Sequence, residues 1–165
     1  MTDKTYNVLF LCTGNSARSV MAEAILNRLG RGRFRAFSAG SHPAGRVNPF
    51  TLDVLKTHGH PTDGFRSKSW DEFARPDAPP MDIVVTVCDS AAGEVCPVWP
   101  GRPATAHWGF PDPAAFQGGD ADKRAFFETV YGMIEKRLRA FATLNLDRLD
   151  PTRLKQALRA LAEVG

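Results

Sequence analysis

The sequence predicts an α/β fold of three layers, in which a four-stranded parallel sheet carries helices on both faces. Two observations lead to this prediction. Short apolar runs rich in strand-forming residues alternate along the chain with segments whose apolar residues recur at helical spacing. The runs also lack polar alternation, which is typical of parallel strands buried on both faces. Ligands bind such sheets at the carboxyl ends of the strands, so we expect the functional residues there.

The first strand and helix are predicted within residues 6–29. Residues 6–11 have the sequence Y-N-V-L-F-L, a strand pattern in which no polar residue follows Asn7. After a short loop, apolar residues recur at helical spacing: Met21, Ala24, Ile25 and Leu29. Gly30 and Gly32 end this pattern, at a point where a helix C-terminus favours a left-handed residue.

A second strand and helix follow. Residues 35–39 form the second predicted strand. Asn48 and Pro49 then provide a capping residue and a proline at the first helical position, ahead of a helix that runs to about residue 57. The alternation of strand and helix therefore continues.

The remaining elements complete the sheet and cover it. Residues 82–87 are a third buried strand, and residues 105–108 are a short fourth. A helix is predicted between residues 118 and 149, where an apolar stripe recurs at spacings of three and four: Phe127, Val130, Ile134, Leu138 and Phe141. Pro151 begins a last amphipathic helix. We predict a single domain over residues 1–165, with residues 150–165 as a C-terminal helical extension.

Composition limits the function classes. The formal net charge of +3 is mild, and the basic residues are spread along the chain, which argues against nucleic acid and is compatible with a small anion. No apolar stretch is long enough to cross a bilayer, so we predict a cytoplasmic protein with no membrane partner. The three cysteines have no C-x-x-C spacing, and the four histidines form no metal-binding pattern. His58 and His60 are expected in a surface turn.

The segment C-T-G-N-S-A-R, between the first strand and the first helix, carries the chemistry. Cys12 and Arg18 lie six positions apart in a turn that leads into a helix N-terminus. Successive backbone N–H groups of such a turn point inward and bind oxyanions, and the helix dipole and the guanidinium add positive charge. The expected oxyanion-binding residues are Thr13, Gly14, Asn15, Ser16, Ala17, Arg18 and Ser19. The same field is expected to lower the pKa of Cys12.

A purely structural alternative is that Cys12 fills the end of a buried strand and Arg18 is a solvated helix residue. Gly14 within the turn, a following Ser19 able to orient the thiolate, and the position after the first strand favour the functional interpretation. Asn15 is expected to hold the loop in shape, because asparagine tolerates left-handed backbone angles.

The motif C-T-G-N-S-A-R-S after an amino-terminal strand resembles the low-molecular-weight tyrosine phosphatase superfamily, in particular its arsenate reductase branch, over residues 5 to about 145. The resemblance implies that Cys12 attacks the bound oxyanion, that Arg18 clamps it, and that an aspartate before proline protonates the leaving oxygen. Asp112-Pro113, in the sequence H-W-G-F-P-D-P-A, matches that aspartate. From local sequence alone, a turn is the better explanation of an aspartate before proline, because this pair is common in turns.

Two further cysteines distinguish reduction from hydrolysis. Phosphatases of this superfamily follow the Asp-Pro pair with tyrosine, where this chain has Ala114, and they need no second cysteine. The resemblance therefore implies reduction of arsenate to arsenite through a disulfide relay in the order Cys12, Cys88, Cys96. Two alternatives stay open: a phosphatase acting on phosphotyrosine or a small ester, and a non-catalytic oxyanion-binding or redox-sensing module.

The resemblance also bears on partners and ions. It implies arsenate as substrate, phosphate or sulfate as competing anions, and no cofactor. Thioredoxin is expected first as the reductant. The spacing of Cys88 and Cys96 is one residue longer than in the best-described thioredoxin-coupled members, so glutaredoxin or a low-molecular-weight thiol is the alternative. Some members bind potassium behind the loop. Asn15, Glu23 and Ser38 match three of those ligands, but the segment around Lys68, residues 67–69, lacks the acidic residue that would be the fourth. We therefore predict no metal, with Lys68 supplying the positive charge.

Overall fold

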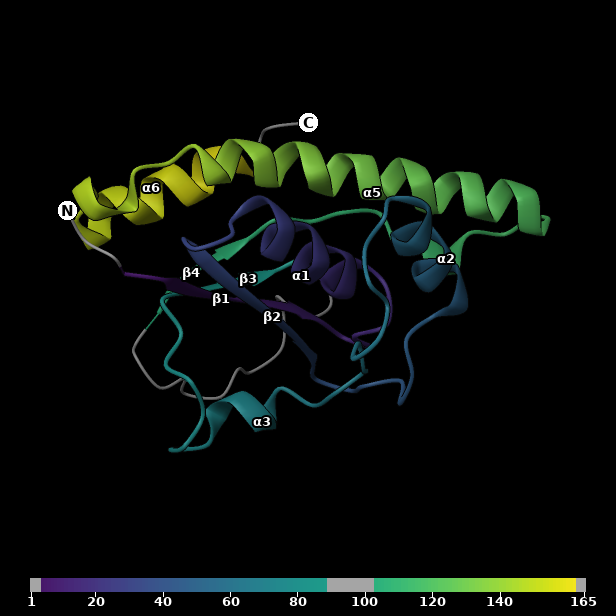
Figure 1. The fold of residues 1–165 in the computed structure, drawn as a ribbon, viewed down its shortest axis with the longest axis horizontal. Helices are drawn as coiled ribbons and strands as arrows, with labels where there is room; N and C mark the ends of the chain where they lie inside the picture. Colours follow the sequence, from purple (N-terminus) through teal and green to yellow (C-terminus); the bar gives the residue numbers. More distant parts are fainter. Residues whose placement is uncertain (1–3, 89–102, 163–165) are drawn as a thin grey trace.

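The computed structural model describes residues 4–88 and 103–162, and its centre is a parallel sheet (Figure 1). The strands lie in the order β2-β1-β3-β4, and all neighbours are parallel. Their bounds are β1 (Tyr6–Cys12), β2 (Phe34–Gly40), β3 (Ile83–Thr86) and β4 (Ala104–His107). The predicted four-stranded parallel sheet is therefore confirmed, with strand ends shifted by one residue or so.

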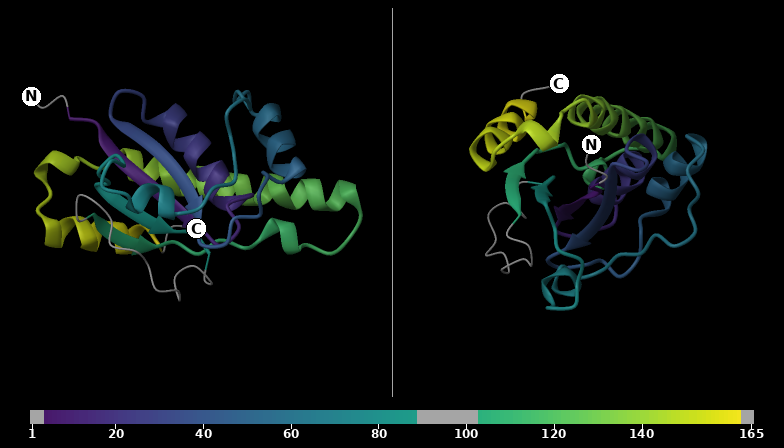
Figure 2. Two further views of the ribbon diagram at one scale, coloured as in Figure 1. Left: turned by 90° about the horizontal axis from the view of Figure 1, so that it is seen from below. Right: turned by 60° about the vertical axis from the view of Figure 1, so that its left-hand side comes forward.

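Helices cover the two faces of the sheet unequally (Figures 1 and 2). Most helices lie on one face, where α1 packs against both β2 and α5. On the opposite face, the described residues include the short helix α3 and the chain around it. The helices are α1 (Arg18–Leu29), α2 (Pro49–Thr57), α3 (Asp71–Ala74), α5 (Asp120–Ala142) and α6 (Pro151–Leu161), with 3₁₀ turns η1 (Pro113–Ala115) and η2 (Leu146–Arg148).

Two apolar clusters form because successive strand residues point to opposite faces. In β1, Val8 and Phe10 enter the large cluster under α1 and α5, while Leu9 and Leu11 enter a smaller cluster with Phe73 of α3. Cys12 belongs to the large cluster. The unbroken apolar run of this strand is thus explained by burial on both faces.

Helix α6 covers β4, the strand at one edge of the sheet. Trp108, which follows β4, is 1% exposed, and its Nε1 donates a 2.9 Å hydrogen bond to the carbonyl of Leu158. The side chain of Leu158 is fully buried. Within residues 4–88 and 103–162, no helix is long and apolar enough to span a membrane.

Three details differ from the sequence predictions. Helix α3 was not predicted, because four residues are too few to show a periodic pattern. His60 is only 6% exposed and bonds to the hydroxyl of Tyr131, so the turn after α2 is present but this histidine is not on the surface. Gly32 has the expected left-handed conformation, with φ of 80°, whereas Gly30 has a φ of −105° and is needed because a Cβ would lie 2.6 Å from the ring of Phe34.

Candidate active site

The loop of residues 12–18 joins β1 to α1, and its carbonyl groups are bonded outward. The carbonyl of Thr13 accepts from the amide of His42, at 2.9 Å, and that of Gly14 accepts from the hydroxyl of Ser67, at 2.9 Å. The carbonyl of Ser16 accepts from the hydroxyl of Thr51 in α2, at 2.8 Å.

This arrangement fixes the direction of the loop amides. A peptide N–H points opposite to the carbonyl of the preceding residue in the same planar unit. The amides of Gly14, Asn15 and Ala17 therefore face away from the outward-bonded carbonyls, toward the inside of the loop. Helix α1 also begins without a side-chain cap, since Ala17 is its capping residue. Inward amides at an uncapped helix N-terminus form an anion cradle.

Asn15 holds the loop to three other segments, as predicted. It is fully buried and has a φ of 47°, the only positive φ among the non-glycine residues that the structure describes. Its Nδ2 donates to the hydroxyls of Ser19 and Ser38, at 2.9 and 3.0 Å, and its Oδ1 accepts from the amide of Lys68, at 2.9 Å. The hydroxyl of Ser19 thus serves Asn15, and not Cys12 as the sequence had suggested.

Arg18 is oriented so that one edge of its guanidinium is available. Its NH1 donates a 3.0 Å hydrogen bond to the carbonyl of Phe110. Its Nε is buried and has no hydrogen-bond partner in the described part of the chain. A buried N–H without a partner is costly, and an oxyanion would satisfy it. The edge formed by Nε and NH2 therefore suits bidentate binding of an oxyanion.

Asp112 lies beside this clamp, which brings together two of the predicted site residues. Its Oδ2 is 3.6 Å from the NH2 of Arg18, and its Oδ1 caps η1 by accepting from the amide of Ala114, at 3.0 Å. Asp112 thus caps a turn and at the same time faces the guanidinium of Arg18. The side chain is 41% exposed.

Cys12 and Cys88 meet at the carboxyl ends of β1 and β3. They are 5% and 2% exposed, both are in the thiol form, and hydrogen bonding to Cys88 is the largest influence on the pKa of Cys12. Thr13 holds Cys88 by two contacts to its Sγ, from the amide nitrogen at 3.3 Å and from the hydroxyl oxygen at 3.6 Å. The amide of Thr13, one of the predicted oxyanion-binding residues, is therefore directed toward the second cysteine in this structure.

The expected lowering of the Cys12 pKa is wrong for this arrangement. The hydrogen bond with Cys88, and then burial, raise the pKa of Cys12, while the positive charge of Arg18 lowers it by less. Two thiols that share a hydrogen bond titrate as a pair, because ionisation of one opposes ionisation of the other. The donors of Thr13 favour the thiolate on Cys88. Sequence reasoning missed this coupling because it considered Cys12 with its own loop alone.

Behind the loop, Lys68 and Glu23 form a partly buried ion pair. The Nζ of Lys68 is 3.9 Å from Oε1 of Glu23, which also accepts a 2.5 Å hydrogen bond from the hydroxyl of Ser38. Burial raises the pKa of Glu23 and lowers the pKa of Lys68. No group of three or more potential metal-ligating side chains occurs within the described residues. The ammonium of Lys68 thus lies where the sequence predicted a positive charge.

Cys96, the third predicted cysteine, lies outside the described residues.

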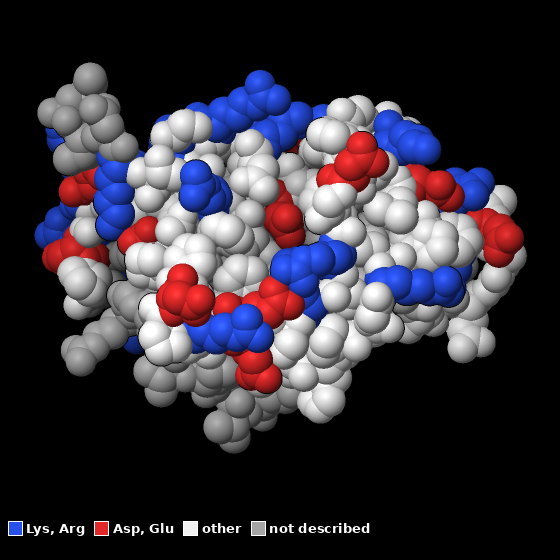
Figure 3. Space-filling view, turned by 60° about the horizontal axis from the view of Figure 1, so that its bottom comes forward, with Lys and Arg blue, Asp and Glu red and all other residues white. Residues whose placement is uncertain are grey.

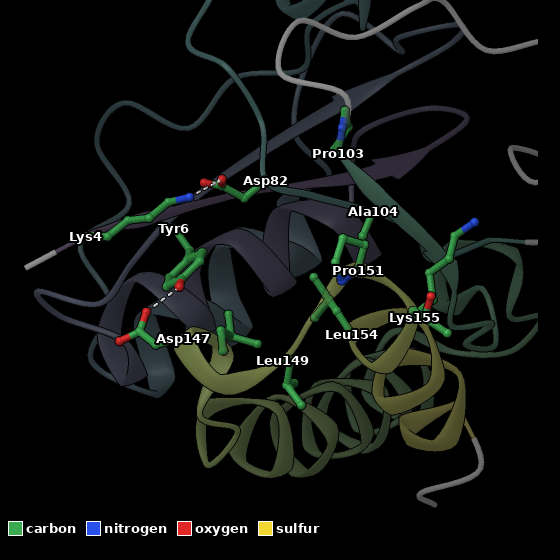
Figure 4. A pocket seen from close by; sticks show the side chains of 12 residues that line it. Lys4, Tyr6, Asp82, Pro103, Ala104, Asp147, Leu149, Pro151, Leu154 and Lys155 are labelled. Carbon is green, nitrogen blue, oxygen red and sulfur yellow. Dashed lines mark hydrogen bonds and ion pairs between the residues drawn. The ribbon is translucent and has the colours of Figure 1, made fainter. Parts of the chain in front are cut away.

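The positive charge at the loop is local. On the face drawn in Figure 3, basic and acidic side chains are interspersed among uncharged ones. A cavity of about 790 Å³ lies at the opposite ends of the strands, beside the first residues of β1 and β4 (Figure 4). Two pairs of its polar groups bond to each other, Lys4 to Asp82 at 2.9 Å and Tyr6 to Asp147 at 2.5 Å. We therefore assign the chemistry to the loop, not to this cavity.

Residues that fix the loop from a distance were missing from the sequence predictions. Ser67 and Thr51 bond to its carbonyls, and Phe110 orients Arg18. Gly40 was missed as well, although a Cβ there would lie 2.4 Å from the carbonyl oxygen of Thr13. Phe110 lies in the quoted segment H-W-G-F-P-D-P-A, but no role was assigned to it there. Ser67, Thr51 and Gly40 belong to no motif that the sequence showed, because each acts from a segment remote in the sequence.

The fold and the loop define a class of protein. The chain belongs to the low molecular weight phosphotyrosine protein phosphatase family, whose model matches residues 7–157. That match reaches into α6 and so extends further than the resemblance seen in the sequence.

Within this class, several of the proteins similar to this chain are arsenate reductases. An arsenate reductase from Halalkalibacterium halodurans is 39% identical over 135 residues, which cover 82% of this chain and 94% of the relative. The crystal structure of an arsenate reductase from Archaeoglobus fulgidus has 31% identity and a TM-score of 0.65, over 83% of this chain and 99% of that one. A second structure, an arsenate reductase in the phosphate binding state, has 26% identity and a TM-score of 0.67, over 84% and 97%.

Proposed function

We propose that this protein reduces arsenate to arsenite, using its own cysteines as the electron donors. The observation that carries the proposal is the placement of Cys12 and Cys88, two buried thiols, at the carboxyl ends of adjacent strands. Hydrolysis needs only the loop cysteine, whereas reduction needs a second thiol within reach of the first. The arsenate reductase from Halalkalibacterium halodurans supports the same function.

In the first step, the loop amides and the Nε–NH2 edge of Arg18 bind arsenate. The thiol of Cys12 gives up its proton to solvent, and its Sγ attacks arsenic as a thiolate. A hydroxyl group of arsenate leaves as water after taking a proton from Asp112, which becomes a carboxylate. The product is a thiol–arsenate adduct on Cys12, with arsenic still in its oxidised state.

In the second step, Cys88 gives up its proton to solvent, and its thiolate attacks the Sγ of Cys12. A disulfide forms, the S–As bond breaks, and its electron pair stays on arsenic, which leaves as arsenite. The two contacts from Thr13 to the Sγ of Cys88 stabilise this thiolate before the attack. Two thiols have then lost two electrons, and arsenic has gained them.

In the third step, Cys96 attacks the Sγ of Cys88 and releases the thiolate of Cys12. The resulting Cys88–Cys96 disulfide is reduced by an external dithiol, for which we propose thioredoxin first and a glutaredoxin or a small thiol second. A cytosolic location fits this cycle, because it starts from free thiols that a reducing compartment maintains. The role of Cys96 rests on its sequence position.

Mass spectrometry of the intact protein after one arsenate turnover without reductant tests the proposal. The wild type should contain a Cys88–Cys96 disulfide. The C96S variant should stop at Cys12–Cys88 with one equivalent of arsenite released, and C88S should release none. Free thiols in the wild type after exposure to arsenate would refute the reductase function.

A phosphatase activity is the second candidate, because Cys12, Arg18 and Asp112 form the hydrolytic set as well. The double variant C88S/C96S separates the two functions. Hydrolysis of an aryl phosphate by that variant at the wild-type rate, with no arsenate reduction by the wild type, would establish a phosphatase.

A further inference from the structure

Arg137 is a buried cation that the mechanism above does not use. It lies on the core-facing side of α5, on the same side as Ile134 and Phe141, and is 5% exposed. Burying a guanidinium is costly unless its surroundings stabilise the charge, and an apolar side chain would avoid that cost. The apolar stripe of this helix is thus interrupted by a residue that packing alone does not explain.

The guanidinium of Arg137 lies over the ring of Phe110. The distance from its Cζ to the ring centroid is 4.4 Å, and Phe110 is itself 5% exposed. A cation over an aromatic face is attracted to it, more strongly where water is excluded. This contact therefore fixes the position and tilt of the Phe110 ring.

The backbone of Phe110 connects three parts of the candidate active site. Its amide donates to the carbonyl of Val87, the residue before Cys88, at 3.2 Å. Its carbonyl accepts from NH1 of Arg18, at 3.0 Å, and Asp112 follows two residues later. A shift of the Phe110 ring would therefore move the carbonyl that orients the anion clamp.

We propose that Arg137 is a positioning residue for oxyanion binding, acting through Phe110 to hold Arg18 with its Nε–NH2 edge toward the loop. Two arginines then meet one phenylalanine, Arg137 at the ring face and Arg18 at the carbonyl. The proposal rests on the proposed function only in taking arsenate as the natural oxyanion. Binding of inorganic phosphate tests it without any turnover.

The test is calorimetric titration of the full chain with inorganic phosphate. R137M removes the cation and keeps an unbranched side chain, and we expect a roughly tenfold weaker Kd, since a misaligned charge-assisted hydrogen bond loses about that factor. R137K keeps a cation without the planar group and should lose about threefold. R139M is the matched control, because Arg139 is on the same helix but 63% exposed, and its Kd should equal that of the wild type. If R137M does not fold, R137K decides, and a wild-type Kd for it would refute the proposal.

A double-variant cycle separates positioning from general destabilisation. In an R18K background the planar guanidinium that Phe110 orients is replaced by an ammonium group. Adding R137M should then change the phosphate Kd less than about twofold. An equal loss in both backgrounds would show that Arg137 acts only on the fold. Neither result requires arsenate reduction. A wild type that binds phosphate but reduces no arsenate would overturn the proposed function, and the phosphate Kd values of the variants would still decide whether Arg137 positions Arg18.

Discussion

Asn15 offers the sharpest test of how the loop is held. The substitution Asn15→Ala removes three hydrogen bonds, two from Nδ2 and one to Oδ1, at a fully buried position. Each contributes about 0.5–1.5 kcal/mol. Alanine must also adopt a φ of 47°, which costs about 1–2 kcal/mol for a residue with a Cβ. We expect the free energy of unfolding to fall by about 3–6 kcal/mol.

Asn15→Gly separates the two contributions. Glycine adopts the left-handed conformation without strain, so this variant should lose only the hydrogen bonds and remain about 1 kcal/mol more stable than Asn15→Ala. Both variants should bind phosphate more weakly, because the amides of the loop are no longer fixed toward the anion. The assays are urea unfolding followed by circular dichroism, and calorimetric titration with phosphate.

The matched control is Asn27→Ala. Asn27 lies in α1, the helix that follows the loop, but away from the loop itself. Asn27 makes two hydrogen bonds to the backbone of Ala36, so its loss should destabilise the protein by about 1–3 kcal/mol and leave phosphate binding unchanged. The reasoning is refuted if Asn15→Ala unfolds within about 1 kcal/mol of the wild type and binds phosphate equally well.

Three further predictions follow from the structure. Removing Cys88 in a C88A/C96A variant should lower the pKa of Cys12, because the hydrogen bond with Cys88 is the largest cause that raises it; alkylation rates of Cys12 against pH measure this. Burial lowers the pKa of His60 to about 4, so its contribution to stability is complete above about pH 6.5 and is lost as the pH falls toward 4. The loss is about 2–3 kcal/mol, measured by urea unfolding, and should be absent in H60Q. Leu158→Ala removes a fully buried side chain between α6 and β4 and should cost about 2–5 kcal/mol in urea unfolding without changing phosphate affinity.

Each of these predictions has an outcome that contradicts it. An unchanged or higher pH midpoint for alkylation in C88A/C96A would show that the loop itself, and not the thiol pair, raises the pKa of Cys12. Equal loss of stability in H60Q and wild type between pH 6.5 and 4 would assign the titration to another group. A weaker phosphate Kd in Leu158→Ala would link α6 to the site.

Much of the fold and the catalytic loop could be predicted from the sequence because the signals are local. The apolar run of residues 6–11 and the stripe of α5 each lie within one element, and the cysteine and arginine of the loop are six positions apart. Asn48 before Pro49 marked the start of α2 correctly, since a cap and an N1 proline act on neighbouring residues. The class of protein followed from this local information.

Only the tertiary structure decided which remote residues meet. The pKa of Cys12 depends on a hydrogen bond to Cys88, which the pairing of β1 with β3 brings to the same sheet edge. The orientation of Arg18 depends on Phe110, and that residue in turn lies against Arg137. Hydrogen bonds and burial depend on distances of a few ångströms between atoms of separate segments, and a periodic pattern along one segment carries no record of them. The sequence thus determined the elements and the loop, while packing determined how the site's charges and protons are arranged.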